Sequence, residues 1–231
     1  IDMPEERNRI IVDSIASILF SPSHDSFERL TKEKKSFQKI YNVGDIMYDI
    51  HCDNLKNKIQ RYSKTTLPNK YVLATIHRQS NVDDSKKLKN IIKFLESLSN
   101  SYYVVFPIHP RTQKNINNFS LKIKSNNVSI IEPQNYSKTQ FLLNNCNFVV
   151  TDSGGIQKES FFHKKPCFIL RENTEWKEII NLGWGKLLNL EKYKFNKNAI
   201  KSFVNLKRKH AKPYGNGKAA EKIKKILLNL L

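Results

Sequence analysis

The amino-acid sequence predicts an α/β protein whose parallel sheet carries helices on both faces. Between residues 71 and 170, short apolar runs alternate with segments that have the apolar spacing of a helix. The connections between them are short, as in strand–helix–strand units that build a parallel sheet. One apolar run, Phe148-Val149-Val150, leads directly into a Ser-Gly-Gly turn and a further helical segment. Together these observations favour a sheet that is covered on both sides.

The first part of the chain precedes this alternation and is expected to be mostly helical. Residues 4–20 carry apolar residues at helical spacing, and Pro4 with two following glutamates suits a first helical turn. We then expect a short helix over 23–30, a strand over 39–43 that Gly44 closes, and a helix over about 46–61. The polar segment 63–69, which contains Pro68, is the best candidate for a linker.

The alternating part supplies the strands of the sheet and the helices that cover it. We expect strands over 71–75, 102–106, 128–131, 148–150 and 167–170. We expect helices over 85–98, 112–119, 138–144 and 157–162. Residues 215–230 predict a final amphipathic helix with Ala220, Ile223, Ile226, Leu227 and Leu230 on its apolar side. Its lysine-rich face is interpreted as solvated rather than bound to a membrane surface.

The composition indicates a basic globular protein. The 231 residues are 39% hydrophobic and carry a formal net charge of +19, enough for one large domain or a domain and a half. The lysines are scattered along the chain without a zinc-finger, RNP or basic-zipper pattern, so we expect no nucleic-acid partner. A positive field of this kind also attracts small anionic ligands.

The cysteines and the apolar segments exclude several other classes of protein. Cys52, Cys146 and Cys167 are widely spaced and odd in number, which indicates no disulfide framework and favours a reducing cytoplasm. The sequence has neither a metal-ligand spacing nor a G-x-G-x-x-G segment, so we predict no metal and no cofactor. No apolar run approaches about 18 residues, so we expect no membrane partner.

Residues 151–160 combine the end of an apolar strand, a Ser-Gly-Gly turn and the start of a helix. Backbone N–H groups are unpaired at such a junction, and the helix dipole adds partial positive charge. Gly154 and Gly155 let an anion approach the backbone, at a strand's carboxyl end where open α/β sheets bind ligands. We interpret the turn as a candidate phosphate site, although an isolated Ser-Gly-Gly triplet is more often an ordinary loop.

The same segment resembles a family motif. Thr151-Asp152-Ser153-Gly154-Gly155-Ile156-Gln157-Lys158-Glu159 is similar to the Thr-Asp-Ser-Gly-Gly-x-Gln-x-Glu segment of the non-hydrolysing UDP-N-acetylglucosamine 2-epimerases. Further segments resemble motifs of that family in the family's order: Pro4-Glu5-Glu6-Arg7-Asn8-Arg9, Val43-Gly44-Asp45, Ala74-Thr75-Ile76-His77-Arg78, His109-Pro110-Arg111, Pro133-Gln134-Asn135-Tyr136, Arg171-Glu172-Asn173-Thr174-Glu175-Trp176 and Pro213-Tyr214-Gly215-Asn216-Gly217. The resemblance implies a Rossmann-like sheet that forms the C-terminal lobe of a two-lobed, glycosyltransferase-B-like fold, together with the end of the first lobe.

The resemblance also implies a division of the chain. Family members are considerably longer and begin with a Rossmann-like half whose Gly-Thr-Arg-Pro-Glu, His-Gly-Asp-Thr and Glu-Ala-Gly-Leu-Arg segments do not occur here. We therefore expect the C-terminal part of such an epimerase. Residues 1–67 are expected to be a remnant of the N-terminal domain and 68–212 the nucleotide-sugar-binding domain. Residues 213–231 are expected to form a helix that packs back on the first domain.

Two residues are the candidates for catalysis. The family eliminates UDP across C1–C2 and adds it back on the other face, which requires a base, an acid and groups that hold the diphosphate. Glu5 aligns with a family carboxylate, although the residue by itself fits a helix-capping glutamate better, and Glu6 is its solvated neighbour. His77 aligns with a family histidine that can relay protons or pair with phosphate, whereas a lone loop histidine is more often a surface residue. Ser80 replaces the family's glutamate before Asn81, and the family's two further carboxylates belong to the absent segments.

The remaining candidates bind the substrate. The resemblance implies that Ser153, Gly154 and Gly155 hold the diphosphate. It implies that Glu159 binds the ribose hydroxyls and that Gln134, with Tyr136 beside it, contacts the uracil. Arg171 is expected either to approach the phosphate or to support the turn.

The leading functional interpretation is a UDP-N-acetylglucosamine 2-epimerase, or its C-terminal lobe, for surface-polysaccharide precursor synthesis. One alternative is a UDP-sugar-binding fragment without turnover. Another is an epimerase for a UDP-diacetamido-uronic acid, because relatives acting on such sugars share the Thr-Glu-Trp sequence found at 174–176. A glycosyltransferase of the same architecture is a third class, against which the Pro-Glu-Glu and Pro-Tyr-Gly segments argue. The expected partners are a UDP-sugar and either a second copy of the chain or a separate N-terminal half.

Overall fold

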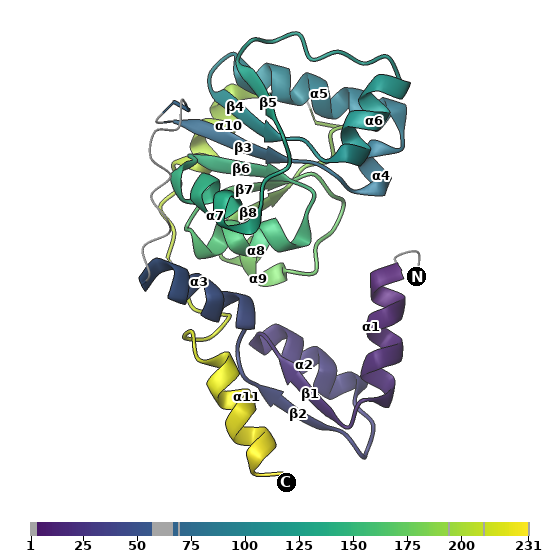
Figure 1. Cartoon of the computed structure of the whole chain (residues 1–231), viewed down its shortest axis with the longest axis vertical. Coiled ribbons are helices and arrows are strands. Elements are labelled where there is room, and N and C mark those ends of the chain that lie inside the picture. The colour runs from purple at the N-terminus through teal and green to yellow at the C-terminus, as the bar shows by residue number, and fades with distance from the viewer. Residues whose placement is uncertain (1–3, 57–66, 69, 194, 210, 231) are drawn as a thin grey trace. The chain divides into compact units, whose positions relative to one another are not determined.

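The computed structural model describes residues 4–56, 67–68, 70–193, 195–209 and 211–230. The chain divides into two compact units (Figure 1). Unit 1 comprises Ile1–Asn57 and Ala211–Leu231, and unit 2 comprises Lys58–His210.

Unit 2 is built on a six-stranded sheet in which every neighbouring pair of strands is parallel. Its strands are β3 (Tyr71–Thr75), β4 (Tyr103–Pro107), β5 (Val128–Ile131), β6 (Phe148–Thr151), β7 (Cys167–Ile169) and β8 (Gly185–Leu187). The order across the sheet is β5-β4-β3-β6-β7-β8, the Rossmann order. The chain runs outward from β3 to β5 and then returns to place β6 on the other side of β3. The strand order therefore reverses between β3 and β6, and open α/β sheets bind ligands at the carboxyl ends of the strands at such a point.

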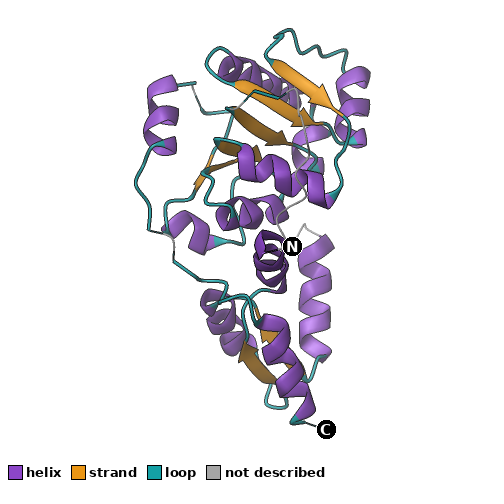
Figure 2. Ribbon diagram, turned by 60° about the vertical axis from the view of Figure 1, so that its left-hand side comes forward, coloured by secondary structure: helices purple, strands orange, loops and turns teal. Residues whose placement is uncertain are grey.

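Helices cover both faces of this sheet, as the orange strands between purple helices show in Figure 2. They are α4 (Gln79–Val82), α5 (Ser85–Ser99), α6 (Pro110–Asn118), α7 (Tyr136–Asn145), α8 (Gly154–Phe162), α9 (Lys177–Asn181) and α10 (Lys197–Val204). Alternate residues of β3 face opposite sides, so Val72 packs in one core with α5, α6 and α10. Leu73 packs in the second core with α7, α8 and α9. Strands buried on both faces explain the nearly continuous apolar runs in the sequence.

Unit 1 contains two parallel strands and four helices within the described residues. The strands are β1 (Ile18–Ser21) and β2 (Lys39–Asn42), and the helices are α1 (Pro4–Ile15), α2 (His24–Glu33), α3 (Ile46–Lys56) and α11 (Ala219–Leu228). The turn at Gly44 meets the segment around Tyr214, and the Asp45 N–H donates to the Tyr214 carbonyl at 3.0 Å. Gly44 has φ +97°, and a Cβ there would lie 3.0 Å from the same carbonyl oxygen, so only glycine suits the position.

A buried aspartate holds the last helix of unit 1 in place. The Asp49 carboxylate on α3 accepts hydrogen bonds from the backbone N–H groups of Ala219 at 3.0 Å and Ala220 at 2.8 Å. These N–H groups are otherwise unpaired at the start of α11, so a side chain 170 residues earlier caps the helix. The contact joins two segments that the sequence pattern alone does not connect.

The predicted α/β fold with helices on both faces of a parallel sheet is confirmed, and the five expected strands of the alternating part are present to within a residue at each end. The helix expected over residues 4–20 is wrong at its end, because Ile18–Ser21 is a strand. Its residues pair with Lys39–Asn42, and burial of Leu19 outweighs the helical spacing. The sequence pattern also missed α4, α9, β8 and α10, which are short or weakly apolar.

The final helix begins later than expected, and two other predicted segments are described only in part. The final helix begins at Ala219 rather than 215, because Gly215 and Gly217 adopt positive φ. Ala219 is buried whereas Ala220, Leu227 and Leu230 are exposed, so the expected apolar side is wrong at these three positions. The end of the helix expected over 46–61 and most of the linker expected over 63–69 lie outside the described residues. No helix among the described residues is long and apolar enough to cross a membrane.

Candidate functional site

The candidate site lies in unit 2 where β3 and β6 end side by side, at the point where the strand order reverses. Thr75 pairs with Thr151 across the two strands, and their hydroxyl oxygens are 2.6 Å apart. The Thr151 hydroxyl also accepts a hydrogen bond from the Ser153 N–H at 3.0 Å. These threonines therefore set the path of the Ser-Gly-Gly turn relative to the neighbouring strand.

Asp152 is the centre of the polar contacts at this site. Its side chain is fully buried and accepts hydrogen bonds from the His77 N–H and the Arg78 N–H, each at 3.0 Å. The Asn81 side-chain amide donates to the same carboxylate at 3.0 Å and to the Leu170 carbonyl at 2.9 Å. Asp152 and Asn81 thus join the loops that follow β3, β6 and β7. Backbone N–H donors to a buried carboxylate give strong, directional bonds, so these loops hold one arrangement.

The Ser-Gly-Gly turn leads into α8 without a side-chain cap. Ser153 is the N-cap residue, but its hydroxyl makes no capping hydrogen bond. The first N–H groups of the nine-residue helix therefore have no side-chain cap, and such groups favour an anion. A Cβ on Gly155 would meet only the Ser153 hydroxyl, at 3.9 Å, so space is open there. A Cβ on Gly154 would lie 2.2 Å from a carboxylate oxygen of Glu175, so that position is already occupied by a neighbour.

The loop 171–176 packs against the Ser-Gly-Gly turn and supports it. Arg171 is 6% exposed at its side chain and forms an ion pair with Glu175 at 2.7 Å. The Trp176 indole N–H donates to the Gly154 carbonyl at 3.0 Å, and the Lys158 ammonium lies 4.2 Å from the Trp176 ring centre. These contacts agree with the expected role of Arg171 in supporting the Ser-Gly-Gly turn. The other expected role, contact with a phosphate, stays a prediction.

Two histidines stand side by side at the carboxyl ends of β3 and β4. The His77 and His109 ring centres are 5.5 Å apart with the rings tilted by 35°. His109 caps α6, and its Nδ1 accepts a hydrogen bond from the Arg111 N–H at 3.1 Å, so neutral His109 carries its proton on Nε2. Hydrogen bonding to Arg111 lowers the pKa of the Asp83 carboxyl, and the two side chains form an ion pair.

Glu159 lies one turn along α8 from the Ser-Gly-Gly turn. Its carboxylate accepts a hydrogen bond from the Gln140 amide at 2.8 Å, and the Gln140 oxygen lies 2.8 Å from His163 Nε2. Burial raises the pKa of the Glu159 carboxyl, and the Gln140 bond and nearby Lys158 oppose that rise. The Gln140 bond therefore fixes the orientation of the Glu159 carboxylate. Burial destabilises its charged form, and a further hydrogen-bond donor, such as a ligand hydroxyl, would stabilise it.

The other expected residues occupy different places. Gln134 and Tyr136 lie after β5, at the same edge of the sheet as the Ser-Gly-Gly turn. The Gln134 amide donates to the Glu132 carbonyl at 2.5 Å, and Tyr136 begins α7 with 38% of its side chain exposed. Glu5 lies in the first turn of α1 in unit 1, and its side chain is outside the described residues. Unit 2 therefore places His77, Ser153, Gly154, Gly155 and Arg171 around one turn, and Glu5 belongs to unit 1.

Sequence reasoning assigned no role to several residues of this site. Asp152 stands inside one family motif, Asn81 lies shortly after another and His109 begins a third, yet their contacts depend on strand order. The available signal for Asp152 was a carboxylate directly after an apolar strand, where burial demands hydrogen-bond partners. Among the described residues, no three histidine, cysteine or acidic side chains lie close enough to hold a metal ion together.

Comparison with known proteins identifies relatives over the full length of the chain. The family model described as UDP-N-acetylglucosamine 2-epimerase matches residues 1–228. The UDP-N-acetylglucosamine 2-epimerase of Methanocaldococcus jannaschii is 38% identical over 98% of this chain and 64% of the relative. The UDP-2,3-diacetamido-2,3-dideoxy-D-glucuronate 2-epimerase of Pseudomonas aeruginosa is 35% identical over 99% of this chain and 64% of the relative.

Solved structures give a consistent result. The crystal structure of the M. jannaschii UDP-GlcNAc 2-epimerase in complex with UDP-GlcNAc and UDP has a TM-score of 0.88 at 37% identity, covering 99% of this chain and 65% of that one. The Neisseria meningitidis UDP-GlcNAc 2-epimerase bound to UDP-GlcNAc has a TM-score of 0.80 at 27% identity, with 98% and 65% covered. The chain thus spans less than two thirds of the length of these relatives.

Proposed function

The chain belongs to the UDP-N-acetylglucosamine 2-epimerase family, and from this premise we propose that it takes part in C2 epimerisation of a UDP-linked acetamido sugar. In this proposal unit 2 binds the UDP group at the Ser-Gly-Gly turn. The observation that carries the proposal is Asp152, which fastens the His77 loop to that turn at the point where the strand order reverses. A donor-rich turn and a histidine held at one edge suit a leaving diphosphate.

The proposed chemistry follows from the sugar. The C2 hydrogen of an acetamido sugar is not adjacent to a carbonyl, so direct proton abstraction is difficult. Elimination of UDP across C1–C2 and its re-addition on the other face avoid that step. The turn N–H groups and the Ser153 hydroxyl would hold the diphosphate, and His77 would assist its departure. Glu159 would bind the ribose, and Gln134 with Tyr136 the uracil.

Glu5 is proposed as one acid–base carboxylate of a site completed by further residues. We propose that these come from a separate N-terminal half or from a second copy of the chain. Unit 1 supports this by leaving apolar side chains of α1 exposed, with exposed fractions of 59% for Ile11, 58% for Val12 and 73% for Ile15. Exposed apolar side chains that lie together on one helix suit a contact with another protein surface. If no such residues join it, the chain is a UDP-sugar-binding fragment without turnover.

A second substrate is a UDP-diacetamido-uronic acid. The relative from P. aeruginosa carries that substrate in its name and is 35% identical to this chain. The Lys158 ammonium and the Trp176 ring stand together beside the Ser-Gly-Gly turn, and a cation there would favour a sugar that bears an extra carboxylate.

The experiment measures C2 deuterium exchange in D2O with UDP-N-acetylglucosamine or the UDP-diacetamido-uronic acid, followed by proton NMR. Exchange by this chain supports catalysis, and the faster substrate identifies the sugar. UDP binding by calorimetry without exchange supports the binding-fragment alternative. Release of UDP only when an acceptor is added would instead indicate a glycosyltransferase, and absence of UDP binding would overturn the proposal.

A further inference from the structure

A cavity lies at the edge of the unit 2 sheet opposite to the Ser-Gly-Gly turn. Its volume is about 500 Å³, within the range of small-molecule sites. Lys70, Asn147, Pro166 and Trp184 line it, and each immediately precedes a strand, namely β3, β6, β7 or β8. The cavity is therefore at the amino ends of the strands, whereas the Ser-Gly-Gly turn is at their carboxyl ends.

The cavity is strongly basic. Lys70, Lys164, Lys165 and Arg208 line it, and none of its described lining residues is an aspartate or a glutamate. Helices α7, α8 and α10 end beside it, and each helix C-terminus contributes about half a negative charge. Four full positive charges exceed these three partial charges, so the local field favours an anion.

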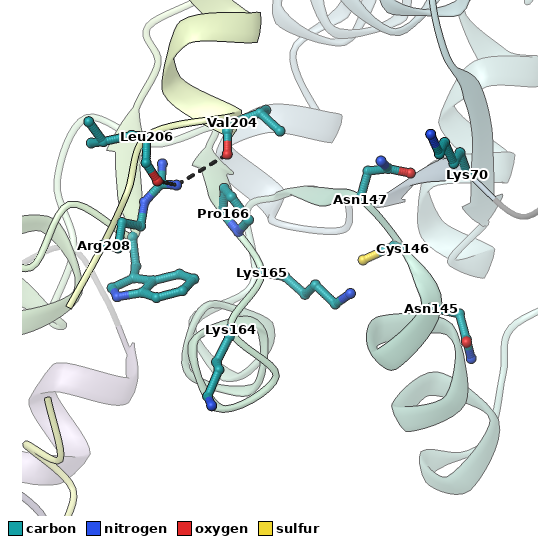
Figure 3. A pocket seen from close by; sticks show the side chains of 11 residues that line it. Lys70, Asn145, Cys146, Asn147, Lys164, Lys165, Pro166, Val204, Leu206 and Arg208 are labelled. Atoms are coloured by element: carbon teal, nitrogen blue, oxygen red, sulfur yellow. Dashed lines mark hydrogen bonds between the residues drawn. The ribbon is translucent and has the colours of Figure 1, made fainter. Parts of the chain in front are cut away.

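Arg208 is held as part of the wall. Its guanidinium donates to the Gly183 carbonyl at 2.6 Å and to the Leu206 carbonyl at 2.9 Å, and it lies 5.3 Å from the Trp184 ring centre. The three lysines make no ion pair within the described part of the chain. Figure 3 shows Lys165 extending from the end of α8 towards the Cys146 segment, across the cavity from Arg208. The lysine charges are thus available to a ligand.

Lys164 has a backbone conformation that does not suit a lysine. It is the second residue after α8, beyond the C-cap His163, and has φ +56°, a left-handed position in which glycine is the favoured residue. The Lys164 N–H donates to the Phe161 carbonyl and the Lys165 N–H to the Ser160 carbonyl, which closes the helix end. Glycine would make the same turn at lower cost, so the lysine side chain is present against the local backbone preference.

Asn147 provides an independent observation. Its side-chain oxygen is buried at the cavity wall and has no hydrogen-bond partner within the described residues. An unsatisfied buried acceptor is costly, and a rotation of this half-buried side chain would bring the oxygen within reach of a hydroxyl on a bound molecule. A ligand that carries both a phosphate and hydroxyl groups would therefore satisfy the lysines and Asn147 together.

We propose that this cavity binds a small phosphorylated metabolite with free hydroxyls, of the sugar-phosphate class. Its phosphate contacts Lys164 and Lys165, and one of its hydroxyls donates to the Asn147 side-chain oxygen. The site is separate from the one proposed for UDP and does not depend on it.

The test uses the two tryptophans of the chain as reporters of the two sites. The Trp184 indole N–H donates to the Lys209 carbonyl beside the basic cavity, and the Trp176 indole N–H donates to Gly154. Glucose 1-phosphate is titrated into ¹⁵N-labelled protein, and Trp176→Phe assigns the two indole signals. Saturable movement of the Trp184 signal supports the proposal, whatever UDP does to Trp176. If the Trp184 indole signal does not shift, the proposal is overturned. It is also overturned if a single-stranded oligonucleotide shifts that signal at a lower concentration than glucose 1-phosphate does.

Variants distinguish a site from general attraction by a basic protein. Lys164→Gly should stabilise the fold while weakening glucose 1-phosphate binding about three- to tenfold, since it removes a charged donor. Ser120→Gly is the matched control, because Ser120 has φ +52° after the last residue of α6 and lies outside the cavity. It should stabilise the fold and leave binding unchanged.

Charge reversal gives a second comparison. Lys164→Glu with Lys165→Glu should weaken binding at least about tenfold, since it replaces two charged donors with repulsive carboxylates. Lys89→Glu with Lys93→Glu changes the net charge equally on the exposed face of α5. Equal weakening by both pairs would show that only the overall charge matters and would overturn the proposal.

Discussion

Replacement of Asp152 by asparagine should both destabilise unit 2 and weaken UDP binding. The buried carboxylate accepts hydrogen bonds from the His77 N–H, the Arg78 N–H and the Asn81 amide. An asparagine oxygen can still face Arg78 and Asn81, but its NH2 group then opposes the His77 N–H. One charge-assisted bond is lost, and the His77 N–H keeps only its longer contact, 3.2 Å, with the oxygen that Arg78 and Asn81 share, so the free energy of unfolding should fall by about 1–3 kcal/mol.

Urea unfolding followed by circular dichroism measures the change in stability, and calorimetry measures UDP affinity. We expect the affinity to fall about tenfold, corresponding to about 1.4 kcal/mol, because the turn and the His77 loop no longer share one anchor. Asp84→Asn is the matched control. Asp84 also accepts two backbone N–H bonds, from Lys86 and Lys87, but at an exposed helix start where asparagine caps equally well.

The control should therefore change stability far less than Asp152→Asn and should leave UDP affinity as it is. The reasoning is refuted if the two substitutions have equal effects on unfolding. It is also refuted if Asp152→Asn destabilises the protein but the remaining folded protein binds UDP normally, since Asp152 would then only support the core.

Three further outcomes follow from the described contacts. Gly155→Ala should leave the free energy of unfolding within about 1 kcal/mol, because its Cβ meets only open space, yet weaken UDP binding in calorimetry; unchanged binding would place the anion elsewhere. Glu159→Gln should be more stable than the natural protein in urea at neutral pH. Burial raises the pKa of Glu159, so the natural protein gains stability as pH falls through that raised value, and the difference should vanish near pH 4; a constant difference would contradict this. Burial raises the pKa values of Cys146 and Cys167 to about 12, so a thiol reagent at about pH 8 should modify only Cys52 before unfolding, and rapid reaction of all three would show the core to be open.

Much of the sheet unit was predictable because its signals are local. Apolar runs such as 71–75 and 148–150 are strands in nearly the expected positions, since a strand buried on both faces requires continuous apolar residues. The Ser-Gly-Gly turn was recognised from three adjacent residues, and the helix that follows begins at Gly154. At residues 18–21 the apolar spacing fits a helix, but the segment is a strand because it pairs with residues 39–42.

The sequence by itself determined the α/β class, the family and the glycine turn, because periodicity, motif order and turn residues are properties of neighbouring positions. Only the tertiary structure decided that β6 lies beside β3, and hence that Asp152 meets the N–H of His77 across 75 positions of the chain. It likewise decided that Asp49 caps a helix 170 residues away. It also decided that three lysines line one cavity at the amino ends of β3, β6, β7 and β8. Hydrogen bonds of this kind depend on strand order and chain return, and periodicity along the chain does not specify either.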